Sequence, residues 1–182
     1  MIIWFKKPKF NNLVWALIGI IIFQIMYFKT QWEIHNGKEW IVFNENRNTM
    51  ITERKGNIVS LFTNDFILAK HSNNSTLNSY LVANFCEIKE KNKIANVMYF
   101  NQNKILVIDS SGIIPLNIHP DILVLTQTPK INLDRILKNI HPKIVIADAS
   151  NYKTIQKFWK QSCTNQKIPF HATAEKGFFR LY

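Results

Sequence analysis

The sequence predicts an α/β protein in which one N-terminal transmembrane helix precedes a soluble domain, built as a β meander followed by a βαβαβ unit. Three observations support this class. An uncharged apolar run covers residues 13–28, short β-rich runs follow between residues 39 and 62, and apolar strands alternate with amphipathic helices from residue 121 onward. We therefore divide the 182 residues into a membrane anchor at 1–30 and a single soluble α/β domain at 31–182.

The apolar run Leu13–Phe28 is 16 residues long and has Gln24 as its one strongly polar member. A helix needs about 17–25 residues to cross a bilayer, and Thr30 and Trp32 extend the run at the interface. We interpret it as a membrane span over residues 13–30. The alternatives are a cleaved signal peptide and a buried core helix. No small-x-small cleavage site follows Phe28, which argues against the signal peptide.

Charges differ on the two sides of the predicted span. Lysines precede it, whereas the lysines beyond it are offset by glutamates. The residues concerned are Lys6, Lys7 and Lys9 before the span, and Lys29, Glu33, Lys38 and Glu39 after it. The positive-inside rule predicts an inner (cytoplasmic) membrane protein with a cytoplasmic N-terminus and a periplasmic or external domain. Residues Met1–Phe5 resemble the end of a preceding membrane helix, although a short interfacial anchor would have the same pattern.

The chain is basic, with a formal net charge of +11. The first 30 residues hold four lysines and no acid, which leaves 19 basic and 12 acidic residues in the rest of the chain. This excess suits an anionic partner such as nucleic acid or lipid headgroups, but charge alone does not choose between them.

The first half of the soluble domain is predicted to be mainly β. The Lys55-Gly56 pair gives the clearest hairpin signal, and a polar loop is expected at residues 72–75. The expected elements are strands at 39–44, 49–54 and 57–62, a helix from 75 or 76 to about 89, and strands at 96–100 and 104–109.

The last third reads as strand, helix, strand, helix and strand. The expected elements are strands at 121–126 and 143–148, a helix capped by Asn132 that stops at His141-Pro142, a helix from Ser150 or Asn151 that buries Tyr152, and a final ribbon from Phe170 to Leu181. A helical connection favours parallel pairing of the first two strands, so their carboxyl ends meet at one edge of the sheet. Ligands bind at this edge in open α/β folds.

Polar and basic residues gather at that predicted edge, where the second helix begins. They form a candidate site for an anion or DNA, since a helix N-terminus with nearby lysines can hold phosphate. The candidate residues are Asp148, Ser150, Asn151, Tyr152, Lys153, Lys157 and Lys160. The alternative is that Ser150 or Asn151 caps the helix and the lysines form a solvated face.

Three motifs in residues 120–181 carry a family resemblance: P-D-x-L-x-L, then x-P-K-x-x-I-A-D-x-S-N, and then I-P-F-H-x-T-x-E-K-G-x-F. By these motifs the chain resembles the metallo-β-lactamase-like domain at the C-terminus of ComEC-type competence proteins, the inner-membrane channels for DNA uptake. It is most similar to Bacteroidetes-type members, whose own domain is shortened. The resemblance implies a reduced metallo-β-lactamase-like domain and a role in natural transformation.

The same resemblance argues against catalysis. Active members carry a Pro-His-His-Gly-Ser-like turn that supplies a metal ligand, where this chain has Thr126-Gln127-Thr128-Pro129-Lys130. An H-x-H-x-D-H run is missing and the five histidines are isolated. A dinuclear zinc site needs about five or six converging His and Asp side chains. We therefore expect no catalytic residues, no metal and no cofactor. The two cysteines, Cys86 and Cys163, are expected as small buried residues.

The leading hypothesis is thus a non-catalytic, membrane-anchored domain of a ComEC-like protein that contacts DNA or the remaining multi-span channel. One alternative keeps a reduced metal site of Asp109, Asp148 and His171 that acts on phosphodiesters. In that case the three side chains should converge; otherwise Asp109 and Asp148 bind backbone N–H groups at strand ends. The other alternative is a single-span protein with a periplasmic interaction domain unrelated to competence.

Overall fold

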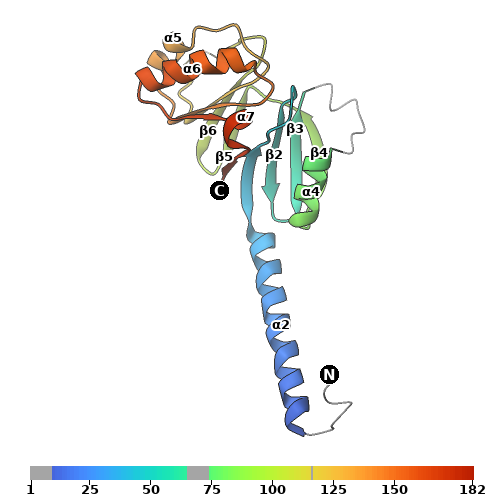
Figure 1. The fold of residues 1–182 in the computed structure, drawn as a ribbon. Helices are drawn as coiled ribbons and strands as arrows, with labels where there is room; N and C mark the ends of the chain where they lie inside the picture. The colour runs from blue at the N-terminus through green and yellow to red at the C-terminus, as the bar shows by residue number, and fades with distance from the viewer. Residues whose placement is uncertain (1–9, 65–73, 116) are drawn as a thin grey trace. The chain divides into compact units, whose positions relative to one another are not determined.

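The computed structural model describes residues 10–64, 74–115 and 117–182 (Figure 1). The chain divides into two compact units between Gly37 and Lys38. The first contains helix α2 (Phe10–Asn36), which includes the predicted span and continues past it. Among the described residues it is the one helix long and apolar enough to cross a membrane, with a mean hydropathy of 1.8. The predictions for Met1–Phe5 and for the lysines at 6, 7 and 9 lie outside the described residues.

Five strands form the first sheet, here called sheet A. They are β1 (Lys38–Val42), β2 (Met50–Lys55), β3 (Ile58–Thr63), β4 (Glu87–Lys93) and β10 (Phe179–Leu181), in the order β10-β1-β2-β3-β4. The predicted meander is confirmed, because β1, β2 and β3 pair antiparallel in sequence order. Gly56 turns β2 into β3 with φ 64°, a conformation that a residue without Cβ adopts freely.

Helix α4 (Ser75–Ala83) is shorter than predicted, and the predicted helical segment near Lys89 is strand β4. The helix ends at Asn84, and Phe85 takes φ 50°, which no α-helix continues. Strand β4 pairs parallel with β3 as an edge strand, and all its charged residues are exposed. An exposed edge strand lacks the alternation that identifies half-buried strands, so its pattern misled the prediction. Residues 65–73 of the polar stretch lie outside the described residues.

The second sheet, sheet B, has the strand order β5-β6-β7-β8-β9. The strands are β5 (Val97–Phe100), β6 (Asn103–Ile108), β7 (Ile122–Leu125), β8 (Ile144–Ala147) and β9 (Phe170–Ala172). Strands β6 to β9 are parallel, as the crossover argument predicted for β7 and β8. Helices α5 (Leu133–Ile140) and α6 (Lys153–Asn165) connect β7 to β8 and β8 to β9. Asn132 caps α5 as expected, by accepting from the Arg135 N–H at 3.1 Å.

The predicted final ribbon from Phe170 to Leu181 is wrong. Strand β9 joins sheet B beside β8, whereas β10 pairs antiparallel with β1 in sheet A. The short helix α7 (Thr173–Lys176) and Gly177, at φ 80°, carry the chain from one sheet to the other. The C-terminal segment therefore ties the two sheets together.

The domain has four layers, with α4 on sheet A, sheet A on sheet B, and α5 and α6 on the outer face of sheet B. The central core packs Trp40, Val42 and Ile51 of sheet A against Ile105 and Val124 of sheet B. The outer cores hold the two cysteines, Cys86 under α4 and Cys163 in α6. Both are buried, as predicted, and the structure shows them as free thiols.

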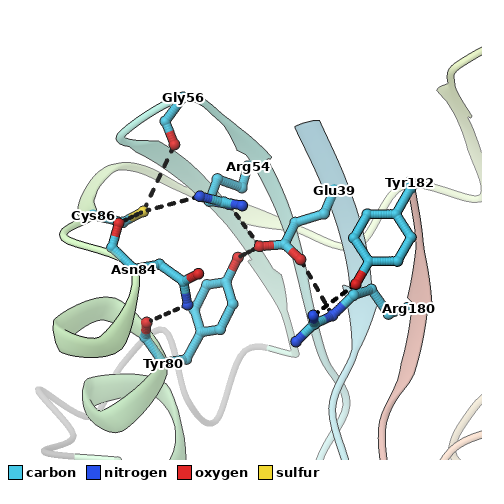
Figure 2. Close-up of polar contacts among 8 residues, drawn as sticks. All are labelled: Glu39, Arg54, Gly56, Tyr80, Asn84, Cys86, Arg180 and Tyr182. Carbon is cyan, nitrogen blue, oxygen red and sulfur yellow. Dashed lines mark hydrogen bonds and ion pairs between the residues drawn. The ribbon is translucent and has the colours of Figure 1, made fainter. Parts of the chain in front are cut away.

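A buried ionic cluster joins α4 to three strands of sheet A (Figure 2). Glu39 is 1% exposed, and its carboxylate contacts Arg54 at 2.6 Å and Arg180 at 3.2 Å. The Tyr80 hydroxyl donates to the same carboxylate at 2.6 Å. Burial raises the pKa of Tyr80 above its usual value, so this hydroxyl keeps its proton. The cluster fixes β10 and α4 to β1.

Candidate anion-binding site

The carboxyl ends of β7 and β8 meet as predicted, through hydrogen bonds between their following loops. The Gln127 N–H donates to Ser150 Oγ at 2.6 Å, and the Thr128 N–H donates to Asn151 Oδ1 at 2.7 Å. Gln127 and Thr128 have φ values of 57° and 52°. Because side chains from the β8 loop satisfy these two amides, the β7 loop holds a conformation that non-glycine residues seldom adopt.

The Asn151 side chain links the carboxyl ends of β7 and β8 through buried hydrogen bonds. It is 4% exposed, and its Nδ2 donates to Leu125 O at 2.6 Å and to Asp148 Oδ1 at 2.8 Å. The Gln156 side chain donates to Asn151 O at 2.9 Å. The expected capping of α6 by Ser150 or Asn151 is therefore wrong. Helix α6 begins at Lys153 with Tyr152 as its N-cap, and no described side chain caps it.

Asp148 lies beneath this edge and is fully buried. Its Oδ1 accepts from the Ser150 N–H at 3.2 Å and from the Asn151 amide, which confirms the strand-end role. Its Oδ2 has no hydrogen-bond partner among the described residues. Burial raises the pKa of Asp148 to about 7, although the Ser150 and Thr49 hydroxyls oppose the shift. Asp148 supports the edge from below and does not line the cavity above it.

A cavity of about 810 Å³ opens above this edge. Four predicted candidates, Ser150, Asn151, Tyr152 and Lys153, line it. The other lining residues are Gln127, Thr128, Ala149 and Ala174, with Asn44, Asn46 and Arg47 from the loop between β1 and β2. Its two cations are Arg47 and Lys153, and no carboxylate of the described residues lines it. We call this space the cationic cavity.

Sequence reasoning missed the contribution of sheet A to the cationic cavity. The polar run from Asn44 to Arg47 is visible between two apolar strands, but nothing local shows which part of sheet B it faces. The connection is made in three dimensions, where Thr49 Oγ1 donates to Ser150 Oγ at 3.3 Å. This contact brings the β1–β2 loop over the β8 loop.

The remaining candidates lie along α6. Tyr152, predicted to be buried, is 72% exposed, because it precedes the helix and its ring borders the cationic cavity. Lys157 is exposed on the helix. Lys160 pairs with Glu175 of α7 at 3.0 Å, in a contact that stays half-exposed. With Lys153 these lysines follow a spacing of i, i+4 and i+7, so they share one side of α6.

The side chains proposed for a reduced metal site do not converge. Asp109 accepts from the Ser111 N–H at 2.9 Å, and His171 contacts Gly177 O at 3.0 Å and the Phe179 ring. No group of three His, Cys, Asp or Glu side chains comes together in the described parts of the chain. The described residues therefore do not fit the zinc pair of a metallo-hydrolase, and the predicted convergence of Asp109, Asp148 and His171 is wrong.

The fold and this site define a class: a four-layer α/β domain with a cavity at the carboxyl edge of sheet B that is lined by two cations and by amide side chains. Residues 40–182 match the family model of the ComEC C-terminal domain, and the chain belongs to this family. It is thus part of a ComEC-like competence protein, as its motifs indicated. No curated protein and no solved structure matches the chain.

Proposed function

We propose that this domain contacts DNA at the cationic cavity and has no hydrolytic activity. Family membership supplies the link to DNA uptake, and the cavity carries the proposal. Arg47 and Lys153 supply positive charge there, while Tyr152 lacks a side-chain cap bond, so the first N–H groups of α6 remain available. A helix N-terminus beside cations binds phosphate, because its amides and dipole both favour negative charge.

We further propose that the chain is anchored in the inner membrane through α2, with its N-terminus in the cytoplasm and the domain outside. The support is the length and apolar composition of α2, together with the lysines that precede it in the sequence. The remaining multi-span channel of a ComEC-like protein is then its membrane partner. The domain would meet incoming DNA at the outer face of that channel.

The absence of hydrolysis is proposed on chemical grounds. We regard the domain as a metallo-β-lactamase-like scaffold in which Thr126-Gln127-Thr128 occupies the turn that supplies a histidine ligand in active members. The Gln127 and Thr128 amides are engaged by Ser150 and Asn151, and the cavity wall offers amides and hydroxyls. Such groups bind and orient a ligand, but they do not activate a metal-bound water.

The test is DNA binding by the full chain in detergent micelles, measured by fluorescence anisotropy over a range of salt concentrations. Arg47→Ala combined with Lys153→Ala should weaken binding and reduce the slope of log K against log salt by about 1.4 for single strands, because two phosphate contacts are lost. The matched control is Lys91→Ala with Lys138→Ala, two exposed lysines outside the cavity. The labelled DNA should be recovered intact with Mg²⁺, Mn²⁺ or Zn²⁺ added.

Two outcomes would contradict this proposal. Binding that is missing at low salt, or equal losses in the cavity variant and its control, would remove the cationic cavity as a DNA contact. Metal-dependent cleavage that persists through purification of several independent preparations would remove the non-catalytic assignment.

A further inference from the structure

A second cavity, of about 570 Å³, runs beside α6. The segment after β7 contributes Pro129, Ile131 and Leu133 to its wall, and α6 contributes Phe158 and Trp159. Phe158 is 70% exposed, although it is one of the largest apolar side chains of the domain. We call this space the apolar groove.

The apolar groove adjoins the cationic cavity. Thr128 lines both spaces, so they are neighbours, and we call the two together the trough. An exposed ring stands in each part, Tyr152 in the cationic cavity and Phe158 in the apolar groove. The trough therefore combines a polar half and an apolar half, each with an aromatic face open to solvent.

The charges along the trough favour an anionic occupant. Arg47 and Lys153 lie in the cationic cavity, and Lys130 lies in the apolar groove. Asp134 is the one acid among the described lining residues, and its carboxylate accepts from the Ser162 hydroxyl at 3.0 Å. Phosphates in this trough would find three cations and one acid that is already engaged.

Exposed rings beside cations fit one anionic polymer in particular. A double helix stacks its bases on one another and presents phosphates to a protein groove, so it gains nothing from Tyr152 or Phe158. A single strand offers free base faces, and stacking on an aromatic ring strengthens binding by roughly tenfold per base. Each base has such a face, so this contact requires no particular sequence.

We propose that the trough binds single-stranded DNA through its unpaired bases, with one base against Tyr152 in the cationic cavity and another against Phe158 in the apolar groove. The amide side chains of Asn44, Asn46 and Gln127 then face the edges of the first base. The intervening phosphates pass Arg47, Lys153 and Lys130. This inference rests on the proposed function, because it specifies how DNA contacts that site.

The experiment compares two probes of equal length and charge, an oligothymidylate and an abasic sugar-phosphate oligonucleotide. Binding to the full chain in detergent micelles is measured by fluorescence anisotropy. The oligothymidylate should bind at least about tenfold more tightly than the abasic probe, and also more tightly than a duplex of the same sequence. Tyr152→Leu and Phe158→Leu should each reduce this preference, because each lowers the affinity for the oligothymidylate more than the affinity for the abasic probe.

Two further variants make the result specific. Tyr152→Phe keeps the ring and should keep the preference. Tyr99→Leu removes a tyrosine that is 66% exposed on β5 and should have no effect. Circular dichroism shows whether the Leu variants remain folded.

The failures of the two proposals are distinguishable. Equal affinity for both probes overturns base stacking while DNA contact through phosphates stands. A loss of preference in Tyr99→Leu as large as in Tyr152→Leu also overturns the assignment to this trough. If neither probe binds, both the stacking inference and the proposed DNA contact fail.

Discussion

Two buried carboxylates, Glu39 in sheet A and Asp148 in sheet B, have opposite surroundings. Glu39 contacts two arginines and a tyrosine hydroxyl, so its charge is matched within 3.2 Å. Asp148 has hydroxyl and amide donors on one oxygen and no described partner on the other. Burying either carboxylate costs free energy, but only for Glu39 is this cost offset by contact with positively charged side chains. The Glu39 cluster therefore fixes the fold, whereas Asp148 lies beneath the cationic cavity and has a raised pKa.

Removing the Glu39 charge is the largest expected effect. Glu39→Gln keeps the shape of the side chain but leaves the buried Arg54 guanidinium without an anion, and β10 loses its ion pair with β1. Breaking a buried pair in this way should lower the free energy of unfolding by about 3–5 kcal/mol. Urea denaturation of the full chain in detergent, followed by circular dichroism, measures the change.

The outcome for Glu39→Gln decides whether the cluster is structural. A loss below about 1 kcal/mol, the value typical of exposed pairs, would contradict the view that Glu39 fixes the fold. An Arg180→Gln variant separates the two contacts. The Arg180 side chain is 34% exposed, and its substitution should lower the free energy of unfolding less than Glu39→Gln, because Arg54 keeps its partner.

Asp148 should make the free energy of unfolding depend on pH. An unfolded aspartate has a pKa of about 4, whereas burial raises the folded pKa to about 7, so the folded protein binds its proton more tightly. The free energy of unfolding therefore falls as the pH rises between these two values, and the penalty is complete above the folded pKa. Asp148→Asn removes that dependence. Between about pH 5 and about pH 8 the unmodified protein should lose on the order of 2 kcal/mol more than the variant.

The measurement is urea denaturation of both proteins at the two pH values. Parallel changes in the two proteins would mean that Asp148 is already ionised in the folded protein at the lower pH, and the contrast with Glu39 would then disappear. Asp109→Asn is the control, since its carboxylate is partly exposed and accepts from the Ser111 N–H.

The contrast between these clusters also shows what the sequence could predict. The strands of the meander and of the parallel sheet follow from local alternation of apolar and polar residues and from apolar runs. Asn132, as an N-cap, marks the start of α5. Glu39, by contrast, looked like one of the charges that flank the membrane span. Its burial depends on Arg54 and Arg180, the second of which lies on the last strand of the chain. No local pattern encodes such a contact.

The residues of the candidate site were also predicted only in part. The residues from Ser150 to Lys153 were placed correctly at the carboxyl ends of β7 and β8, because parallel crossovers constrain where strands end. Arg47 was not predicted as a site residue, since it lies on a loop of sheet A. The packing of one sheet on another is not a sequence pattern. The alternative that Ser150 or Asn151 caps α6 is wrong, and the Asn151 side chain instead donates to Leu125 and Asp148. An asparagine can cap a helix or link two loops through its side chain, and only the fold shows which of these roles it has.

The smallest expected effect concerns an ion pair that is neither buried nor at the carboxyl edge of sheet B. Lys160 and Glu175 are about half-exposed and 3.0 Å apart. Exposed pairs contribute about 0–1 kcal/mol, so Glu175→Gln should leave the urea midpoint nearly unchanged. The variant releases the Lys160 ammonium on the lysine side of α6, so DNA affinity at low salt should rise by roughly twofold, while Lys160→Ala should lower it. If Glu175→Gln destabilised the domain as strongly as Glu39→Gln, charge pairing would matter irrespective of burial, and the distinction between Glu39 and Asp148 would need a different cause.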